Sequence, residues 1–280
     1  MQSNAKKVFY YHADANSLGG YIEEPFEGII PAVSSISLPA VGGYGTNRTE
    51  ALNFKEIISC RSAYTRVSGR ALAEDGPWST QVTSVVEGLN ILEIVTAERV
   101  ISQISVEHPR EGGGASISFA GTHFEKLTIG GHEVCPRLNS RLMGTGSEAD
   151  NDASRLMWPA LLQAGHGQAR EIVQSVTERA NRSGWEWALQ RYGWMDEKRE
   201  QKKDGCVLCS LVDGVEGTVP GKTIGHVVEI PDFGRIFLGE ILAFPHSIQL
   251  TMVRAELGCN VHGKVSAGSS SINGGTMPPS

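Results

Sequence analysis

Four residues near the C-terminal end of the chain have side chains and a spacing that could bind a metal ion. Cys206 and Cys209 form a C-x-x-C pair, and Cys259 and His262 form a second pair with the same spacing. Thiolate and imidazole groups in such pairs are typical zinc ligands. Both pairs fall in segments with a strand pattern, however, and residues three apart in a strand point to opposite faces. We therefore interpret the cysteines as small buried hydrophobic residues, and the sequence predicts no metal and no cofactor.

A glycine-rich segment, 214–223, has part of the spacing of a phosphate-binding P-loop. The motif requires a glycine at the position of Glu216, whose carboxylate would instead repel phosphate. The chain also has no G-x-S-x-G nucleophile elbow and no H-E-x-x-H zinc motif. Glu229 and Asp232 could act as paired carboxylates, but an isolated pair in a turn is usually solvated. No motif identifies catalytic residues, which stay unknown at this point.

Tyrosine, histidine and aspartate side chains gather near the N-terminus. Tyr10, Tyr11, His12 and Asp14 form the densest polar and aromatic cluster of the chain, beside a predicted loop at 12–20. Such a cluster could contact a ligand or a partner; the alternative is that it only marks the end of a strand. We keep Tyr11, His12 and Asp14 as candidate contact residues.

Tryptophan is concentrated in one part of the chain, together with arginine. Both residue types are enriched at the energetic centres of interfaces, so they could form a contact surface. The alternative is that they pack this part of the chain onto the rest. Trp185 and Trp187 cannot both face inward at helical spacing, which makes one of them a candidate for an external contact. The residues concerned are Trp158, Trp185, Trp187, Trp194, Arg179, Arg182 and Arg191, of which Trp185, Trp187, Trp194 and Arg191 are the candidate contact residues.

The elements that must position these residues are predicted to be mainly strands, and the stretch 82–134 is the centre of the pattern. Between Val100 and Val106, apolar and polar residues alternate, which is typical of a half-buried strand. The same alternation returns at 248–267. There the apolar residues are even-numbered up to Met252 and odd-numbered from Val253, and this change of phase predicts a bulge or corner.

Between these two blocks, the apolar spacing becomes helical over 168–181 and again after Gly184. The segment Gly165-His166-Gly167 is interpreted as a loop between helical segments. We expect the first part of a β-sandwich at 1–150, a helical insertion at 151–204 and the second part of the sandwich at 205–280. The predicted fold is mainly β, an antiparallel, jelly-roll-like β-sandwich with a helical insertion. The apolar residues of the first helical face are Ala169, Ile172, Val173, Val176 and Ala180.

Two short segments resemble the signature of the choice-of-anchor β-sandwich domains of bacterial surface proteins. They are GLNILEIVTAERV at 88–100 and GTHFEKLTIGG at 121–131. This resemblance covers about 82–134 and implies a β-sandwich without catalytic residues. The chain departs from that family because it shows neither a signal peptide nor a C-terminal membrane anchor. As a whole, it also resembles bacterial hypothetical proteins of unassigned function.

Length, charge and cysteine usage limit the classes of function. The 280 residues can bury a sizeable core, and a net charge of −6 argues against nucleic acid or an anionic membrane as the main partner. No apolar run approaches the roughly 18 residues of a membrane span. The N-terminus lacks the apolar stretch of a secretory signal. The 5 cysteines form no disulfide framework, so we expect a cytoplasmic protein, or a cell-surface protein if a leader was removed.

Two hypotheses about function remain open. The first is a non-enzymatic binding or assembly protein, which contacts a protein partner or itself through the Trp/Arg-rich insertion. The second is an enzyme or small-molecule-binding protein with a polar site between sandwich and insertion, for which His12, Asp14, His226 and Glu229 are the proposed groups. A pocket on the order of several hundred Å3 with titratable groups of shifted pKa would favour the second hypothesis. An exposed apolar patch on the insertion would favour the first.

Overall fold

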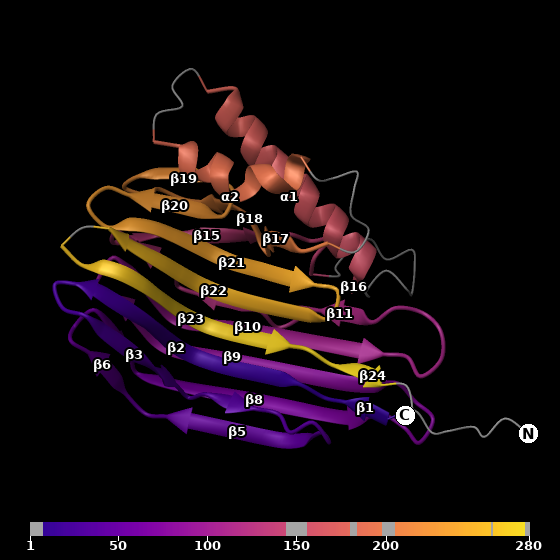
Figure 1. Cartoon of the computed structure of the whole chain (residues 1–280). Helices are drawn as coiled ribbons and strands as arrows, with labels where there is room; N and C mark the ends of the chain where they lie inside the picture. Colours follow the sequence, from indigo (N-terminus) through magenta and orange to yellow (C-terminus); the bar gives the residue numbers. More distant parts are fainter. Residues whose placement is uncertain (1–7, 144–155, 180–183, 198–204, 259, 278–280) are drawn as a thin grey trace, which may run out of the picture.

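The computed structural model describes residues 8–143, 156–179, 184–197, 205–258 and 260–277, and its architecture is mainly β (Figure 1). Two large antiparallel sheets form the body of the molecule, and two helices lie beside one end of the strand stack (Figure 1). The predicted fold class, a mainly β antiparallel sandwich with a helical insertion, is confirmed.

The first sheet is built around the long hairpin of β9 (Trp78–Ile91) and β10 (Val95–His108). As the alternating pattern predicts, Val100, Ile104 and Val106 of β10 are buried. The other strands of this sheet are β5 (Gly43–Thr49), β6 (Leu52–Phe54), β7 (Ile58–Cys60), β8 (Ser62–Ala71), β11 (Ser116–Ser118), β12 (His123–Glu125), β13 (Thr128–Ile129), β14 (His132–Glu133) and β16 (Leu156–Met157).

The second sheet is a meander of β20 (Val227–Ile230), β21 (Gly234–Phe244), β22 (Ser247–Gly258) and β23 (His262–Ile272), extended by β2 (Ala13–Glu24). Because β2 pairs with β23, residues close to the N-terminus complete the sheet of the C-terminal part. The sheet also contains β3 (Gly28–Val33), β4 (Ile36–Ser37), β17 (Val207–Ser210) and β19 (Lys222–Ile224). Two smaller pairs join β1 (Val8–Tyr10) to β24 (Gly275–Met277), and β15 (Cys135–Leu138) to β18 (Val212–Glu216).

Side chains from both sheets share one interior, as the sequence predicts. Strands β2, β22 and β23 pack against β8, β9 and β10. Across this interior the hydroxyl of Ser102 donates a hydrogen bond to that of Ser270 at 2.9 Å. The sheets approach closely at Gly268, where a Cβ would lie 3.2 Å from Cβ of Met252 and 3.3 Å from Cγ1 of Val100.

The predicted change of phase at Met252 and Val253 is also present. Both side chains are fully buried, although consecutive residues of a regular strand face opposite ways. In the ladder between β21 and β22, Met252 and Gly239 are the two residues that form no pair, and the pairs before and after them keep the same register. Gly239 has a φ of +62°. Because of this irregularity, Phe237 and Glu240 lie on the same face of β21, where both contact Arg254.

The insertion consists of α1 (Trp158–Thr177) and α2 (Glu186–Glu197), within the predicted range 151–204. The predicted loop at Gly165-His166-Gly167 is wrong, because α1 continues through it. Gly165 lies against β17, where a Cβ would be 2.1 Å from Cγ2 of Val207, so the glycine serves close helix–sheet packing.

Gln168 fixes α1 to the end of β17. Its side-chain oxygen accepts a hydrogen bond from the backbone N–H of Ser210 at 2.7 Å, and its nitrogen donates to the Ser210 carbonyl at 3.1 Å. Ala169, Ile172 and Val176 are buried on the same side, as their spacing predicts. Neither helix in the described part of the chain has the length and apolar character needed to cross a membrane.

Candidate functional site

A cleft of about 830 Å3 opens where β1, β24, the β21–β22 turn and the start of α1 come together; we call it the end cleft. Sandwich and insertion both line it, since Trp158 is the first residue of α1. Aromatic side chains dominate the lining and come from Tyr10, Tyr11, His12, His108, Trp158, Phe244 and His246. Aliphatic surface comes from Val106, Ile117, Ile248 and Ile272.

The strand register places Trp158, Ala115 and His108 side by side. Each is the neighbour in sequence of one of three aligned positions: Met157 on β16 pairs with Ser116 on β11, which pairs with Glu107 on β10. Adjacent strands are about 4.8 Å apart, so the backbones of Trp158 and His108 are separated by about 10 Å. One small molecule can therefore reach both side chains.

A packed aromatic cluster supports the wall that carries His108. The ring of Phe9 stacks on Trp78 with centroids 5.0 Å apart, and it also contacts Tyr11 at 4.8 Å and His108 at 4.9 Å. Arg110 covers the Trp78 ring at 5.0 Å. Buried aromatic contacts of this kind restrict side-chain motion, so His108 and Tyr11 are held in place on a rigid wall.

The end cleft carries no permanent charge. Its lining includes no Asp, Glu, Lys or Arg among the residues that the structure describes. Burial, together with the neighbouring His246, lowers the pKa of His108, so its imidazole is neutral at pH 7. Burial also raises the pKa of the Tyr11 hydroxyl, which stays protonated. The site thus suits an uncharged molecule better than an ion.

Two buried nitrogen atoms of the lining have no hydrogen-bond partner within the described ranges, Nε1 of Trp158 and Nδ1 of His108. Leaving a buried polar group unsatisfied typically costs about 1–3 kcal/mol, and most such groups in proteins are paired. The indole N–H is a donor, and the imidazole nitrogen donates or accepts according to its tautomer. Both atoms are covered by protein, however, so neither is presented to a molecule in the open cleft.

Two of the three residues predicted from the N-terminal cluster line the end cleft, Tyr11 and His12. Asp14 does not line it; its Oδ2 lies 3.5 Å from Nε2 of His12, and both side chains are partly exposed. The sequence did not point to His108 or His246. His108 is the last residue of β10 and His246 occupies a turn, and neither position belongs to a motif, so only the fold brings them to Tyr11.

A second cluster of polar side chains joins α2 to the second sheet. Glu240 of β21 is almost fully buried; its carboxylate lies 2.7 Å from Nη2 of Arg191 and 2.5 Å from Nε of Arg254. The hydroxyl of Tyr192 lies 3.0 Å from Nε2 of the fully buried His226.

The charge of Glu240 is maintained by its neighbours. Burial opposes ionisation, but the His226 imidazole and the guanidinium groups of Arg254 and Arg191 outweigh it, and they hold the Glu240 pKa well below its usual range. The partners of the carboxylate are all residues of the chain itself, so this cluster, the Glu240 network, serves to fix α2 on the sheet.

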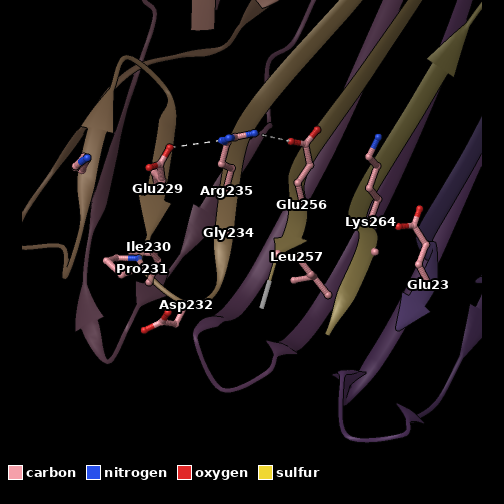
Figure 2. Close-up of a pocket in the computed structure, with 13 residues that line it drawn as sticks. Glu23, Glu229, Ile230, Pro231, Asp232, Gly234, Arg235, Glu256, Leu257 and Lys264 are labelled. Carbon is pink, nitrogen blue, oxygen red and sulfur yellow. Dashed lines mark hydrogen bonds and ion pairs between the residues drawn. The ribbon is translucent and has the colours of Figure 1, made fainter. Parts of the chain in front are cut away.

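A hollow of about 590 Å3 lies on the outer face of the second sheet. Four charged side chains that line it, labelled in Figure 2, form what we call the charged row. Glu229, Arg235, Glu256 and Lys264 occupy neighbouring strands in register and alternate in charge. Arg235 Nε lies 3.5 Å from Glu229, and its Nη1 lies 3.6 Å from Glu256. Opposite charges across neighbouring strands stabilise the sheet, and they leave no field of one sign to attract a charged ligand.

The four groups proposed to converge on a polar site do not meet. Asp14, which pairs with His12, is on β2, whereas Glu229 is on β20 close to His226. Strands β21, β22 and β23 lie between β2 and β20, and four strand spacings amount to roughly 19 Å. The predicted combination is wrong because the order of strands in a sheet is not visible in their local pattern.

The described tryptophans of the insertion pack onto the rest of the protein. Trp187 donates from Nε1 to Oε2 of Glu229 at 3.1 Å, and its ring meets Phe237 edge to face. Trp185 is buried in the core. Because α2 begins at Glu186, helical spacing does not relate the two tryptophans, and it gives no reason for one of them to make an external contact.

The remaining residues of the Trp/Arg set are also engaged where the structure describes them. Trp194 donates from Nε1 to the carbonyl of Arg191 at 2.7 Å. Arg179 lies over the Trp185 ring at 4.3 Å. Arg182 is outside the described residues. These contacts support the interpretation that tryptophan and arginine attach the insertion to the sandwich.

The cysteine and histidine residues considered as zinc ligands do not form a described metal site. Within the described part of the chain, no group of three or more His, Cys, Asp or Glu could hold a metal ion. Cys259 lies outside it. Cys209 pairs with Ile241 of β21, which pairs with Leu250 of β22, whereas His262 pairs with Gly258 of β22. Leu250 and Gly258 are about 26 Å apart along β22, so Cys209 and His262 are far from each other.

Comparison with known proteins identifies a family but no activity. One family model matches residues 9–244, and its description is a domain of unknown function. Neither the curated proteins nor the solved structures with which the chain was compared gave a match.

Proposed function

The chain belongs to the family described as Domain of unknown function (DUF8256), and from its end cleft we propose that it binds an uncharged, largely apolar small molecule. One observation carries the proposal. The lining of this cleft is rich in aromatic and aliphatic side chains and has no Asp, Glu, Lys or Arg among the described residues.

The dimensions and position of the end cleft support binding of a small molecule. Ligand sites are typically concave, about 300–1,000 Å3 in volume, mainly apolar and equipped with a few polar groups that orient the ligand. The end cleft has a volume of about 830 Å3 and lies between the sandwich and the start of the insertion. The location agrees with the second functional hypothesis, although the residues differ from those proposed for it.

Binding through the insertion to a protein partner is less well supported. An apolar contact surface requires exposed side chains that can anchor a partner, but Trp185 is buried. The indole N–H of Trp187 donates to Glu229, and that of Trp194 donates to the Arg191 carbonyl. Catalysis is not part of the proposal, since none of the described residues in the cleft lining is a carboxylate that could act beside the histidines.

Fluorescence of prodan, an uncharged naphthyl ketone, tests the proposal. Its emission moves to the blue in apolar surroundings, so we expect a saturable, blue-shifted signal with the unmodified protein. Gly275→Leu should fill part of the cleft, because Gly275 lines it and a Cβ there meets no atom within 4 Å. We expect affinity at least about tenfold weaker, equivalent to about 1.4 kcal/mol.

Gly193→Leu is the matched control for this experiment. Gly193 is on α2, does not line the cleft, and also has no atom within 4 Å of a Cβ. This variant should bind prodan as tightly as the unmodified protein. Lack of saturable binding, or equal binding by the two variants, would contradict a ligand site in the end cleft.

The compartment is a further part of the proposal. Cys60 and Cys209 are free and buried, and Cys135 is free and exposed. Free thiols of this kind fit a reducing environment, so we propose the cytoplasm as the place where this protein acts.

A further inference from the structure

We propose that Asn273 in the end cleft is a site of spontaneous modification: its side-chain amide is converted to a carboxylate, and this conversion weakens ligand binding in the cleft. Asn273 lines the cleft and is exposed to solvent. It is the only asparagine of the chain that is followed by glycine. The modification stands by itself, whereas its effect on binding rests on the proposed function.

The conversion needs only the chain and water. The backbone nitrogen of Gly274 attacks the side-chain carbonyl carbon of Asn273 and loses its proton to solvent, while the C–N bond of the side-chain amide breaks and ammonia leaves. The product is a cyclic imide, and water then opens this ring at one of its two carbonyl carbons to give aspartate or isoaspartate. The overall change is the hydrolysis of one amide to a carboxylate and ammonium, so no oxidant or reductant takes part.

The local structure leaves the two reacting groups accessible to each other. Asn273 and Gly274 lie between β23 and β24 and belong to neither strand. Glycine lacks a Cβ, so no side chain of its own shields the attacking nitrogen. Within the described part of the chain, neither the Asn273 side chain nor the Gly274 N–H makes a hydrogen bond. The groups therefore meet without first breaking an internal hydrogen bond.

Conversion to isoaspartate changes the wall of the cleft. Before the reactive pair, the N–H of Asn273 donates to the carbonyl of His12 at 2.9 Å; after it, Gly275 pairs with Tyr10. Isoaspartate adds one carbon to the main chain between these two fixed points, so both contacts cannot keep their geometry. The packing leaves little room for adjustment, because a Cβ on Gly274 would lie 3.2 Å from the carbonyl oxygen of Tyr10.

Both products also change the charge of the cleft. Aspartate and isoaspartate bring a negative charge to a lining that has none among the described residues. An apolar ligand that covers the carboxylate removes part of its hydration, which costs free energy. A carboxylate also favours the protonated form of the histidines that line the same cleft, and so adds further charge to the site. The modified protein should therefore bind an uncharged ligand less well.

Incubation of the full chain at pH 8, followed by mass spectrometry of its peptides, tests the modification. Conversion at Asn273 should be at least about tenfold faster than at Asn47 in the same sample, since only Asn273 is followed by glycine. Asn47 is the matched internal control: it is exposed as well, but Arg48 follows it and its side chain donates to the carbonyl of Ser35 at 2.8 Å. Enzymatic methylation of isoaspartate separates the two products.

Prodan titration before and after incubation tests the consequence for binding. Affinity should fall about five- to tenfold in the fully converted protein, and Asn273→Asp should show part of this loss without incubation. Asn273→Gln keeps an amide but lengthens the side chain, which disfavours closure of the ring. The affinity of this variant should be the same before and after incubation.

The outcomes separate the inference from the proposed function. Conversion at Asn273 that is no faster than at Asn47 overturns the inference. Complete conversion with unchanged affinity, in a protein that binds prodan before incubation, overturns it as well. If freshly prepared protein does not bind prodan, the proposed function fails together with the effect on binding, whereas the mass spectra still decide whether Asn273 is modified.

Discussion

The guanidinium group of Arg191 lies 2.7 Å from the carboxylate of Glu240, so a residue of α2 is ion-paired with a buried residue of β21. Arg254 of β22 binds the other carboxylate oxygen. The insertion and the second sheet are thus joined at a point from which water is largely excluded. Removing one partner of such a network leaves buried charge uncompensated.

Glu240→Gln should therefore destabilise the protein strongly. We expect the free energy of unfolding to fall by about 3–5 kcal/mol, because Arg191 and Arg254 keep their charges and lose their common partner. Urea unfolding followed by tryptophan fluorescence measures this change. Glu125→Gln is the control, since Glu125 pairs with Arg99 at a more exposed position, and it should have only a small effect. Similar losses in both variants would argue against a special role for the buried pair.

Acid should weaken the same network. The Glu240 pKa is below its ordinary value of 4.5 in the folded protein, so ionised Glu240 contributes stability that is complete above about pH 5. This contribution is lost as the pH falls below 4.5 towards the folded pKa. Unfolding free energies measured from pH 6 to pH 3 should decline less steeply in Glu240→Gln than in the unmodified protein. Parallel declines would show that other carboxylates dominate the acid response.

Two glycines of α1 should respond in opposite directions to the same substitution. Gly165→Ala places a Cβ 2.1 Å from Cγ2 of Val207 and should destabilise the protein by about 1–3 kcal/mol, because helix and sheet must move apart. Gly167→Ala meets no atom within 4 Å and should stabilise by roughly 0.5–1 kcal/mol through helix propensity. Thermal unfolding of the two variants tests the helix–sheet contact, which would be refuted if Gly165→Ala were as stable as Gly167→Ala.

The parts of this fold that could be predicted from the sequence are those governed by local periodicity. Alternation over 100–106 identifies a strand because each side chain faces either core or solvent. The change of phase at Met252 is visible for the same reason. Helical spacing likewise locates the buried face of α1 at Ala169, Ile172 and Val176.

The parts that could not be predicted depend on contacts between distant segments. Nothing in the pattern of β2 indicates that it pairs with β23. The end cleft has the same origin: Trp158 and His108 are brought together only because β16 and β10 both pair with β11. Tyr11 and His12 could be selected as candidates from their residue types, but His108 belongs to no local cluster in the sequence.

Ligand binding in the end cleft should depend on pH through His108. Its pKa is lowered from an ordinary value of 6.5, so the neutral imidazole predominates at and above pH 6.5. An apolar ligand displaces water and disfavours the charged imidazole further, and by linkage protonation must weaken binding. Prodan affinity should be constant from pH 8 to pH 6.5 and should fall as the pH is lowered further.

Two variants assign this pH dependence to a side chain. His108→Gln should greatly reduce it, because the substitution removes the imidazole whose pKa is lowered by burial. His246→Gln should move the loss of affinity towards higher pH, because the positive charge of His246 helps to lower the His108 pKa. Burial raises the pKa of the Tyr11 hydroxyl, so Tyr11 stays protonated over this range and produces no transition. If the His108 imidazole is seen to titrate by NMR in the free protein and prodan affinity stays constant through that titration, His108 lies outside the binding site.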